Sequence, residues 1–172
     1  MIKFLIQLLL ITSLCSEEMN DAAADKFTFP FWRDMNLLNK STFKSEDHRA
    51  YVDLYVNDLA KNPYILESEK FPIGSIIVKP LYPKQKRENI ARLMVMMKMK
   101  KGYDKKNSDW WYGVYDESGM NAYDQGRINS CITCHEVAED TDYLFSESVM
   151  YKITSQPIFK DTNSIHKPVQ KD

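Results

Sequence analysis

The sequence predicts a single α+β domain that is built on a mainly antiparallel β-sheet and carries helices toward its C-terminus. The chain has 172 residues, of which 44% are hydrophobic, and this is enough to bury one core. Residues 71–119 are rich in β-branched and aromatic side chains, which favour strands. Residues 131–135 and 143–153 have the spacing of helices.

The N-terminal residues predict export. Lys3 precedes an uncharged stretch from Phe4 to Leu14, which is typical of an export signal and too short to span a bilayer. We therefore assign residues 1–15 to this signal and expect a periplasmic protein. Two alternatives stay open at Cys15. The signal is either cleaved beside this residue, or it is a lipoprotein signal that leaves lipid on Cys15 and tethers the protein to a membrane.

Residues 46–63 predict a helix. Ser45 or Asp47 can serve as its N-cap, and Pro63 is a suitable end. Residues 54–56 are equally compatible with a strand because tyrosine and valine favour extended backbone. A strand is therefore the alternative for the end of this segment.

Residues 71–83 contain a clearer strand signal. The β-branched residues 76–78 follow a turn that contains proline and glycine. Pro80 and Pro83 come next, and proline cannot donate a hydrogen bond to a neighbouring strand. We therefore expect the continuation of this strand at an edge of the sheet.

Two further strands are predicted in the middle of the chain. Residues 91–104 form a long strand that ends at Gly102, and residues 109–119 form its antiparallel partner. Trp110 and Trp111 are neighbours on the second strand, so their side chains point to opposite faces of the sheet.

The charge of the chain argues against nucleic acid as a partner. The formal net charge is −1, which provides no long-range field to attract phosphates. The segment "YPKQKREN" (82–89) is only a short basic turn.

The segment "CITCH" contains the chemistry-bearing residues Cys131, Cys134 and His135. A zinc site would need about four ligands, and only His48 and His166 remain to complete one. A redox dithiol is expected in a βαβ setting, which the sequence does not show. The third alternative is covalent haem, in which both thiols form thioether bonds and the histidine binds the iron. We favour one covalently attached haem c.

The motif lies close to the C-terminus, which bears on the sixth iron ligand. Met150 is the one methionine after His135, and it belongs to an apolar stripe with helical spacing that is typical of core packing. We therefore expect five-coordinate iron with an open distal face.

Four segments occur in an order that resembles the cytochrome P-460 family of periplasmic c-type haem proteins, which includes the nitric oxide-binding cytochromes c′-beta. These segments are "FPIGSIIVK" (71–79), "DWWYGVYDESG" (109–119), "CITCH" (131–135) and "TDYLFS" (141–146). The resemblance implies a mainly antiparallel sheet across the distal face of the haem, with helices that include the C-terminal CxxCH attachment segment. It also implies a homodimer and small nitrogen ligands such as nitric oxide or hydroxylamine.

On this basis we divide the chain into four parts. The export signal is followed by an N-terminal extension (16–45), a haem domain like that of cytochrome P-460 (46–160) and a polar tail (161–172).

The resemblance also singles out two positions in the haem pocket. Lys79 matches the lysine that is bonded to the porphyrin edge in the founding enzymes, and a lysine that only contacts the haem or solvent is the alternative. Met94 falls near the position of the distal glutamate in the hydroxylamine-oxidising members. Methionine cannot accept a proton, which weakens the expectation of hydroxylamine oxidation. Met94 and Met96 alternate onto one face of the strand, and either can line the pocket.

Four other residues receive weaker assignments. Asp142 is expected to cap the following helix and could hold the N–H of His135, as a carboxylate partner often does. Arg127 can pair with a haem propionate, although a solvated arginine is the alternative. His48 and His166 are expected at the surface.

The sequence thus predicts an exported monohaem c-type cytochrome that binds nitric oxide or a related nitrogen species. A hydroxylamine-oxidising enzyme with haem cross-linked to Lys79 is the first alternative, and an electron-transfer cytochrome is the second. Each is expected to have a periplasmic redox partner.

Overall fold

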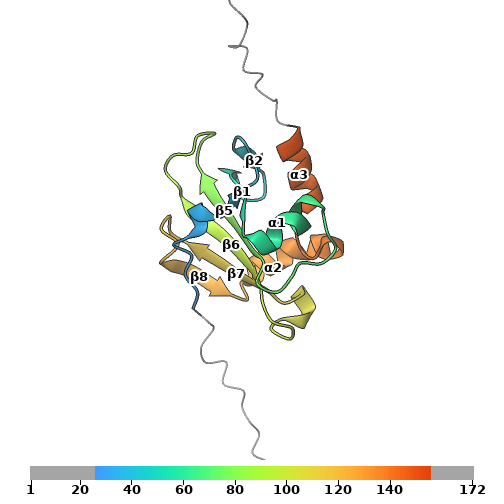
Figure 1. Cartoon of the computed structure of the whole chain (residues 1–172). Coiled ribbons are helices and arrows are strands. Elements are labelled where there is room, and N and C mark those ends of the chain that lie inside the picture. Colours follow the sequence, from blue (N-terminus) through green and yellow to red (C-terminus); the bar gives the residue numbers. More distant parts are fainter. Residues whose placement is uncertain (1–25, 156–172) are drawn as a thin grey trace, which may run out of the picture.

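The computed structural model describes residues 26–155, and this part of the chain folds around one antiparallel β-sheet of eight strands with three α-helices (Figure 1). The predicted α+β class is therefore confirmed. The predictions for the export signal, Cys15, the polar tail and His166 concern residues outside the described range.

Six strands form a continuous path across the sheet. In spatial order they are β1 (Asn36–Leu37), β4 (Tyr55–Val56), β5 (Ile76–Tyr82), β6 (Arg92–Lys98), β7 (Trp110–Tyr115) and β8 (Ala122–Gly126). A hairpin of β2 (Phe43–Ser45) and β3 (Ala50–Val52) joins the sheet where β3 pairs with β5. The predicted strands in the middle of the chain correspond to β5, β6 and β7, and β6 and β7 pair antiparallel as expected. The polar strand β8 was not predicted.

The helix predicted over residues 46–63 is wrong for most of its length. Residues 46–49 are the turn of the β2–β3 hairpin, and strands β3 and β4 follow. Helix α1 (Asp58–Ile65) begins only after Asn57, whose side chain accepts a hydrogen bond from the N–H of Ala60 at 3.1 Å. It also continues past Pro63.

Buried hydrogen bonds of Asp53 explain why this segment extends into the sheet. Its carboxylate accepts hydrogen bonds from Asn39 (2.7 Å), Tyr82 (3.1 Å) and Arg87 (2.8 Å). Asp53 is fully buried, and a buried carboxylate is tolerated only with such partners. These contacts hold the chain between β3 and β4 against β5.

The prediction that Pro80 lies on an edge strand is also wrong. Strand β5 is interior, because β6 pairs along one side and β4 and β3 share the other. On that shared side the pairing passes from Val78, opposite β4, to Leu81, opposite β3. Pro80 lies in this interruption, so its missing N–H breaks no hydrogen bond with β3 or β4.

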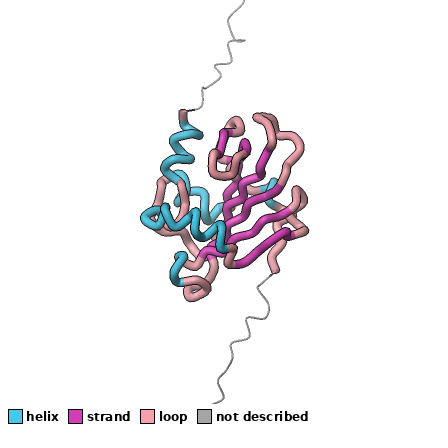
Figure 2. Tube along the Cα trace, turned by 180° about the vertical axis from the view of Figure 1, so that it is seen from behind, coloured by secondary structure: helices cyan, strands magenta, loops and turns pink. Residues whose placement is uncertain are grey.

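Both faces of the sheet are covered. Helices α1, α2 (Asn129–His135) and α3 (Ser146–Thr154) lie on one side, over a core that contains Trp110 (Figures 1 and 2). The N-terminal segment around the 3₁₀ turn η1 (Trp32–Asp34) packs on the other side, over Trp111. The two tryptophans therefore point to opposite faces, as predicted.

A buried ion pair fixes the loop between the 3₁₀ segment η3 (Glu136–Thr141) and α3. Asp142 has no exposed side-chain surface, and its two carboxylate oxygens lie 2.6 and 2.7 Å from Nζ of Lys98. The same carboxylate accepts hydrogen bonds from the N–H of Phe71 (2.8 Å) and from the Ser108 hydroxyl. The carbonyl of Asp142 accepts a 2.7 Å hydrogen bond from the indole of Trp110. The loop is thereby tied to β6 and β7.

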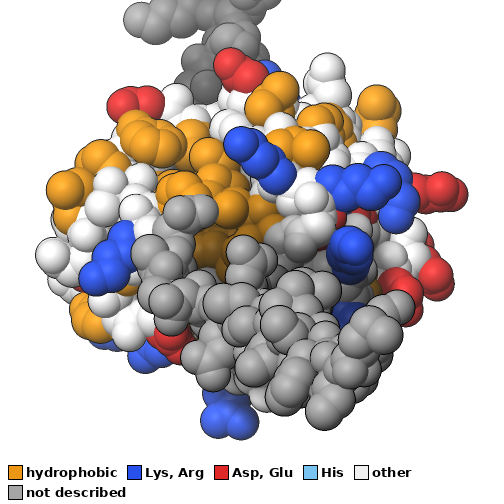
Figure 3. Space-filling view, turned by 90° about the horizontal axis from the view of Figure 1, so that it is seen from below, with side chains coloured by type: hydrophobic (Ala, Val, Ile, Leu, Met, Phe, Trp, Pro, Cys, Tyr) orange, Lys and Arg blue, Asp and Glu red, His pale blue; other side chains and the backbone are white. Residues whose placement is uncertain are grey.

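Apolar side chains are also found at the surface. Leu59, Leu66 and Ile73 are among the exposed large hydrophobic residues. Figure 3 shows one face on which apolar side chains gather, with Lys and Arg side chains beside them.

Within residues 26–155, no helix has both the length and the hydropathy needed to cross a membrane. The homodimer and the redox partner stay predictions.

We expect Gly119→Ala to destabilise the fold strongly. Gly119 has φ +72°, and an added Cβ would lie 2.4 Å from the carbonyl oxygen of Phe29. The matched control is Gly102→Ala. Gly102 also has a positive φ (+99°), which is unfavourable for alanine, but an added Cβ there would have no neighbour closer than 3.9 Å. Denaturant unfolding should show a loss of about 1 kcal/mol for the control and of about 3 kcal/mol or more for Gly119→Ala. Equal losses would refute the steric explanation.

Asp142→Asn should lower the free energy of unfolding by about 3 kcal/mol, because it leaves the Lys98 ammonium buried without a counter-charge. Asparagine tolerates the left-handed backbone at this position (φ +54°), so the change tests the charge. The control is Glu117→Ala, which removes an ion pair to Arg33 whose side chains are 50% and 58% exposed and should cost less than about 1 kcal/mol. Similar losses in both variants would contradict a special role for the buried pair.

Candidate haem site

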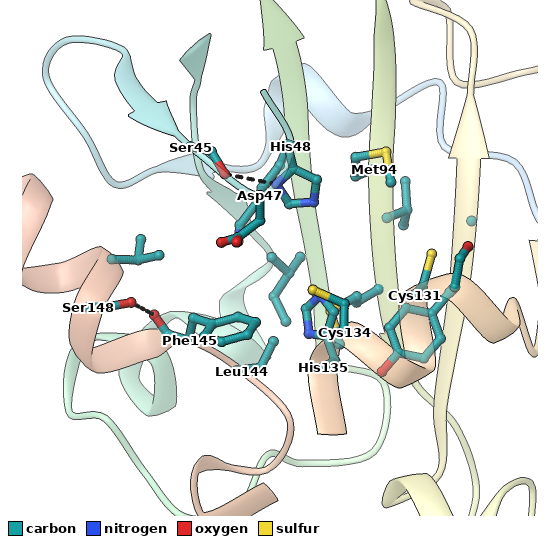
Figure 4. A pocket seen from close by; sticks show the side chains of 18 of the residues that line it. Ser45, Asp47, His48, Met94, Cys131, Cys134, His135, Leu144, Phe145 and Ser148 are labelled. Atoms are coloured by element: carbon teal, nitrogen blue, oxygen red, sulfur yellow. Dashed lines mark hydrogen bonds between the residues drawn. The ribbon is translucent and has the colours of Figure 1, made fainter. Parts of the chain in front are cut away.

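A cavity of about 240 Å³ lies between the sheet and the helices (Figure 4). The turn of the β2–β3 hairpin borders it on one side and helix α2 on the other. Strands β5, β6 and β7 form its wall, and the loop before α3 together with α3 completes the enclosure.

All three residues of the CxxCH motif border this cavity. Cys131, Cys134 and His135 lie on α2, where a spacing of three or four residues places side chains on the same face. Both cysteines are free thiols. Cys131 is half-buried and Cys134 is exposed. Two thiols and one imidazole are thus presented to one space.

His135 is held in an orientation that suits an iron ligand. Its Nδ1 lies 2.6 Å from the carbonyl oxygen of Tyr143, and since a carbonyl can only accept, Nδ1 carries the proton and donates. The lone pair is then on Nε2. The ring packs edge-on against Tyr112 and Phe145, at centroid distances of 5.5 and 5.3 Å.

The same surroundings keep the imidazole neutral. Burial lowers the pKa of His135 to about 4, and it outweighs the hydrogen bond to Tyr143, which acts in the opposite direction. A neutral imidazole is the form that binds metal.

The expected carboxylate partner of His135 is not observed. Asp142 is engaged with Lys98, and the backbone carbonyl of the next residue takes the imidazole N–H instead. Tyr143 has φ +65°, which is unusual for a bulky residue and costs about 1–3 kcal/mol. The ion pair of Asp142 helps to hold this strained backbone, so the carboxylate acts on the histidine indirectly.

The sheet presents two rows of side chains to the cavity. Directly opposite residues form the rows Lys79–Met94–Val114 and Ile77–Met96–Tyr112 across β5, β6 and β7. All of them except Val114 line the cavity. Both methionines that were expected on one face of the strand therefore contribute to the wall. Lys79 faces the cavity from the middle of β5, and burial lowers its pKa to about 8.

These residues fit a haem. The two thiols and Nε2 of His135 border one cavity with a largely apolar wall. The buried hydroxyl of Tyr112, another lining residue, has no hydrogen-bond partner within the described part of the chain, so it is available to a group in the cavity. Among residues 26–155, no three His, Cys, Asp or Glu side chains are arranged to hold a bare metal ion, so this region offers no ligand set for the zinc alternative.

Two of the other assigned residues lie outside the lining. The Arg127 guanidinium donates to the carbonyl of Tyr103 and stacks on its ring at 4.7 Å. Met150, on α3, is partly buried and packs against the core, as predicted.

The expectation that His48 is a surface residue is wrong. It is half-buried and lines the cavity, together with Ser45 and Asp47 from the same hairpin. Sequence reasoning missed this group because residues 46–63 were interpreted as a helix. The signal that could have revealed it is the extended character of residues 54–56, which favours strands before α1.

The comparisons agree with this geometry. A model of the family described as Cytochrome P460 matches residues 31–146, which is well over half of the chain. No curated protein matches the sequence. The match includes the CxxCH motif and every strand that lines the cavity. The chain belongs to the cytochrome P460 family and is therefore a haem protein.

Proposed function

We propose that this protein is an exported monohaem c-type cytochrome that binds nitric oxide or a related small nitrogen species at an open iron position. Cys131 and Cys134 would attach one haem covalently, and His135 would be the proximal ligand. The observation that supports this most directly is that both free thiols and Nε2 of His135 border one cavity. Bound haem iron supplies a coordination position for a small ligand.

Different residues of the chain have different roles in the proposed site. Tyr143 orients the proximal imidazole through its carbonyl oxygen. Met94 and Met96 supply apolar wall and keep water away from the ligand. Neither can accept a proton, and nitric oxide binding, unlike oxidation of an amine, needs no proton acceptor. These two positions therefore suit ligand binding, and a proton acceptor for oxidation would have to come from another lining residue, such as Asp47 or His48.

Hydroxylamine oxidation is the second candidate, and the position of Lys79 favours it. Lys79 lines the cavity and its lowered pKa makes a neutral, nucleophilic amine more accessible. This residue is therefore available to the porphyrin edge. A periplasmic redox partner would be needed to accept the electrons from hydroxylamine.

Two further expectations are part of the proposed function in either case. They are a lipid on Cys15 that tethers the protein to a membrane, and a homodimer.

We expect the full chain, exported from a host with haem-attachment machinery, to have the mass of the processed polypeptide plus one haem. Its ferrous form should be high-spin and should bind carbon monoxide and nitric oxide. The double variant Cys131→Ser/Cys134→Ser should lack covalent haem, whereas His135→Ala should keep the attached haem and lose the proximal ligand field. Mass spectrometry and optical spectra measure both effects.

Cys15→Ser is the matched control for the thiol substitutions. It should leave the haem mass unchanged and should change only a lipid increment, if one is present. Colourless protein with the bare polypeptide mass would refute the haem c assignment. Haem-loaded ferrous protein that is low-spin and inert to carbon monoxide would refute the open site.

Met94 is the cross-strand partner of Lys79 and cannot accept a proton, which weakens the hydroxylamine-oxidising alternative. We therefore expect no haem cross-link at Lys79. Lys79→Ala should leave the ferrous absorption bands unchanged, and tryptic peptides should contain Lys79 unmodified. Lys152→Ala, which removes another lysine from the cavity lining, is the matched control. A red-shifted ferrous band that disappears only in Lys79→Ala would establish the cross-link and favour the hydroxylamine-oxidising alternative.

A further inference from the structure

The turn of the β2–β3 hairpin places a histidine across the cavity from the proximal one. In Figure 4 the rings of His48 and His135 lie on opposite sides of the cavity. His48 comes from residues 46–49, whereas His135 comes from α2. A group held between them would therefore meet an imidazole on each side.

The position of His48 is set by its own hairpin. The pairing of Ser45 with Ala50 closes a four-residue turn. Within this turn the N–H of Arg49 donates to the carbonyl of Glu46 at 3.0 Å, and Arg49 has φ +50°. The side chain is held as well, because Ser45 Oγ lies 3.0 Å from Nδ1 of His48. Nε2 is the nitrogen that remains for a group in the cavity.

Burial keeps the ring of His48 neutral. It is the main cause that lowers the pKa of His48 to about 4, and Lys79 on β5 and His135 on α2 act in the same direction. Asp47 in the same turn acts in the opposite direction. A neutral imidazole can donate or accept one hydrogen bond at Nε2, depending on which partner carries the proton between Ser45 and Nδ1.

The strand residues of the wall differ in what they offer a ligand. Ile77, Met94 and Met96 are apolar and hold a ligand only by packing, whereas Lys79 and Tyr112 are polar. His48 adds a further polar group from a different element, the turn of the hairpin. A hydrogen bond in such a low-dielectric site has more effect than in water.

We propose that His48 is the distal hydrogen-bonding residue of the pocket, and that it favours polar nitrogen ligands that have an N–H, O–H or terminal oxygen over apolar gases. This inference rests on the proposed open haem site. Ser45 is a positioning residue in this arrangement, since it acts through Nδ1 of His48.

The test uses the full haem-loaded chain with carbon monoxide as the probe. A hydrogen bond to the bound probe lowers its C–O stretching frequency. We expect the infrared band of the ferrous complex to move to higher frequency in His48→Leu and to stay near the original value in His48→Gln, which keeps a hydrogen-bonding side chain. Ser45→Ala should broaden or shift the band less than His48→Leu.

Ligand affinity provides the second measurement. The dissociation constant for hydroxylamine should rise about tenfold in His48→Leu, as expected for the loss of one hydrogen bond, while carbon monoxide affinity changes far less. Glu46→Gln is the matched control, because it changes an exposed residue of the same turn that does not line the cavity, and it should change neither the band nor the selectivity.

The remaining outcomes separate this inference from the proposed function. If the unaltered protein binds carbon monoxide and His48→Leu leaves both band and affinities unchanged, the inference fails and the proposed function stands. If the unaltered protein is low-spin and only His48→Leu binds carbon monoxide, His48 is itself an iron ligand, and both the inference and the open site are refuted. A chain without haem refutes the proposed function, and the inference fails with it.

Discussion

The hydrogen bond from Nδ1 of His135 to the carbonyl of Tyr143 is the interaction on which the candidate site depends. It fixes the tautomer of the histidine and leaves the Nε2 lone pair for a ligand. Tyr143, which supplies this carbonyl, adopts a left-handed backbone. That conformation is costly, and the Lys98–Asp142 ion pair next to it ties the loop to the sheet. The orientation of His135 is thus supported by a charge pair that does not itself line the cavity.

The pocket is assembled from parts that are distant in the sequence. The hairpin contributes His48, the sheet contributes Lys79 and Met94, and α2 contributes the thiols and His135. The interior strand β5 connects the first two, since β3 pairs with it at Leu81 and Tyr82 while Lys79 faces the cavity. The register of β5 therefore sets the spacing between the hairpin and the apolar wall.

Local patterns in the sequence were sufficient to single out the CxxCH motif and to predict the central strands. The spacing of Cys131 and Cys134 has few chemical interpretations, and the β-branched and aromatic residues of β5 to β7 have strong local preferences. The hairpin was missed because its strands are short and depend on tertiary contacts. For example, hydrogen bonds from Asn39, Tyr82 and Arg87 to the carboxylate of Asp53 hold this residue beside the sheet.

The partner of His135 was missed for a related reason. A carboxylate at position 142 was the plausible acceptor from sequence, but its engagement with a lysine on β6 depends on strand register. Pro80 provides a third case, because only the interruption between β3 and β4 makes proline acceptable inside the sheet. In each case the deciding contact joins residues whose proximity no local pattern encodes.

The unequal exposure of the two thiols has a consequence for their reactivity. Cys131 is half-buried whereas Cys134 is exposed. Before any haem is attached, a thiol reagent in solution therefore reaches Cys134 more easily than Cys131.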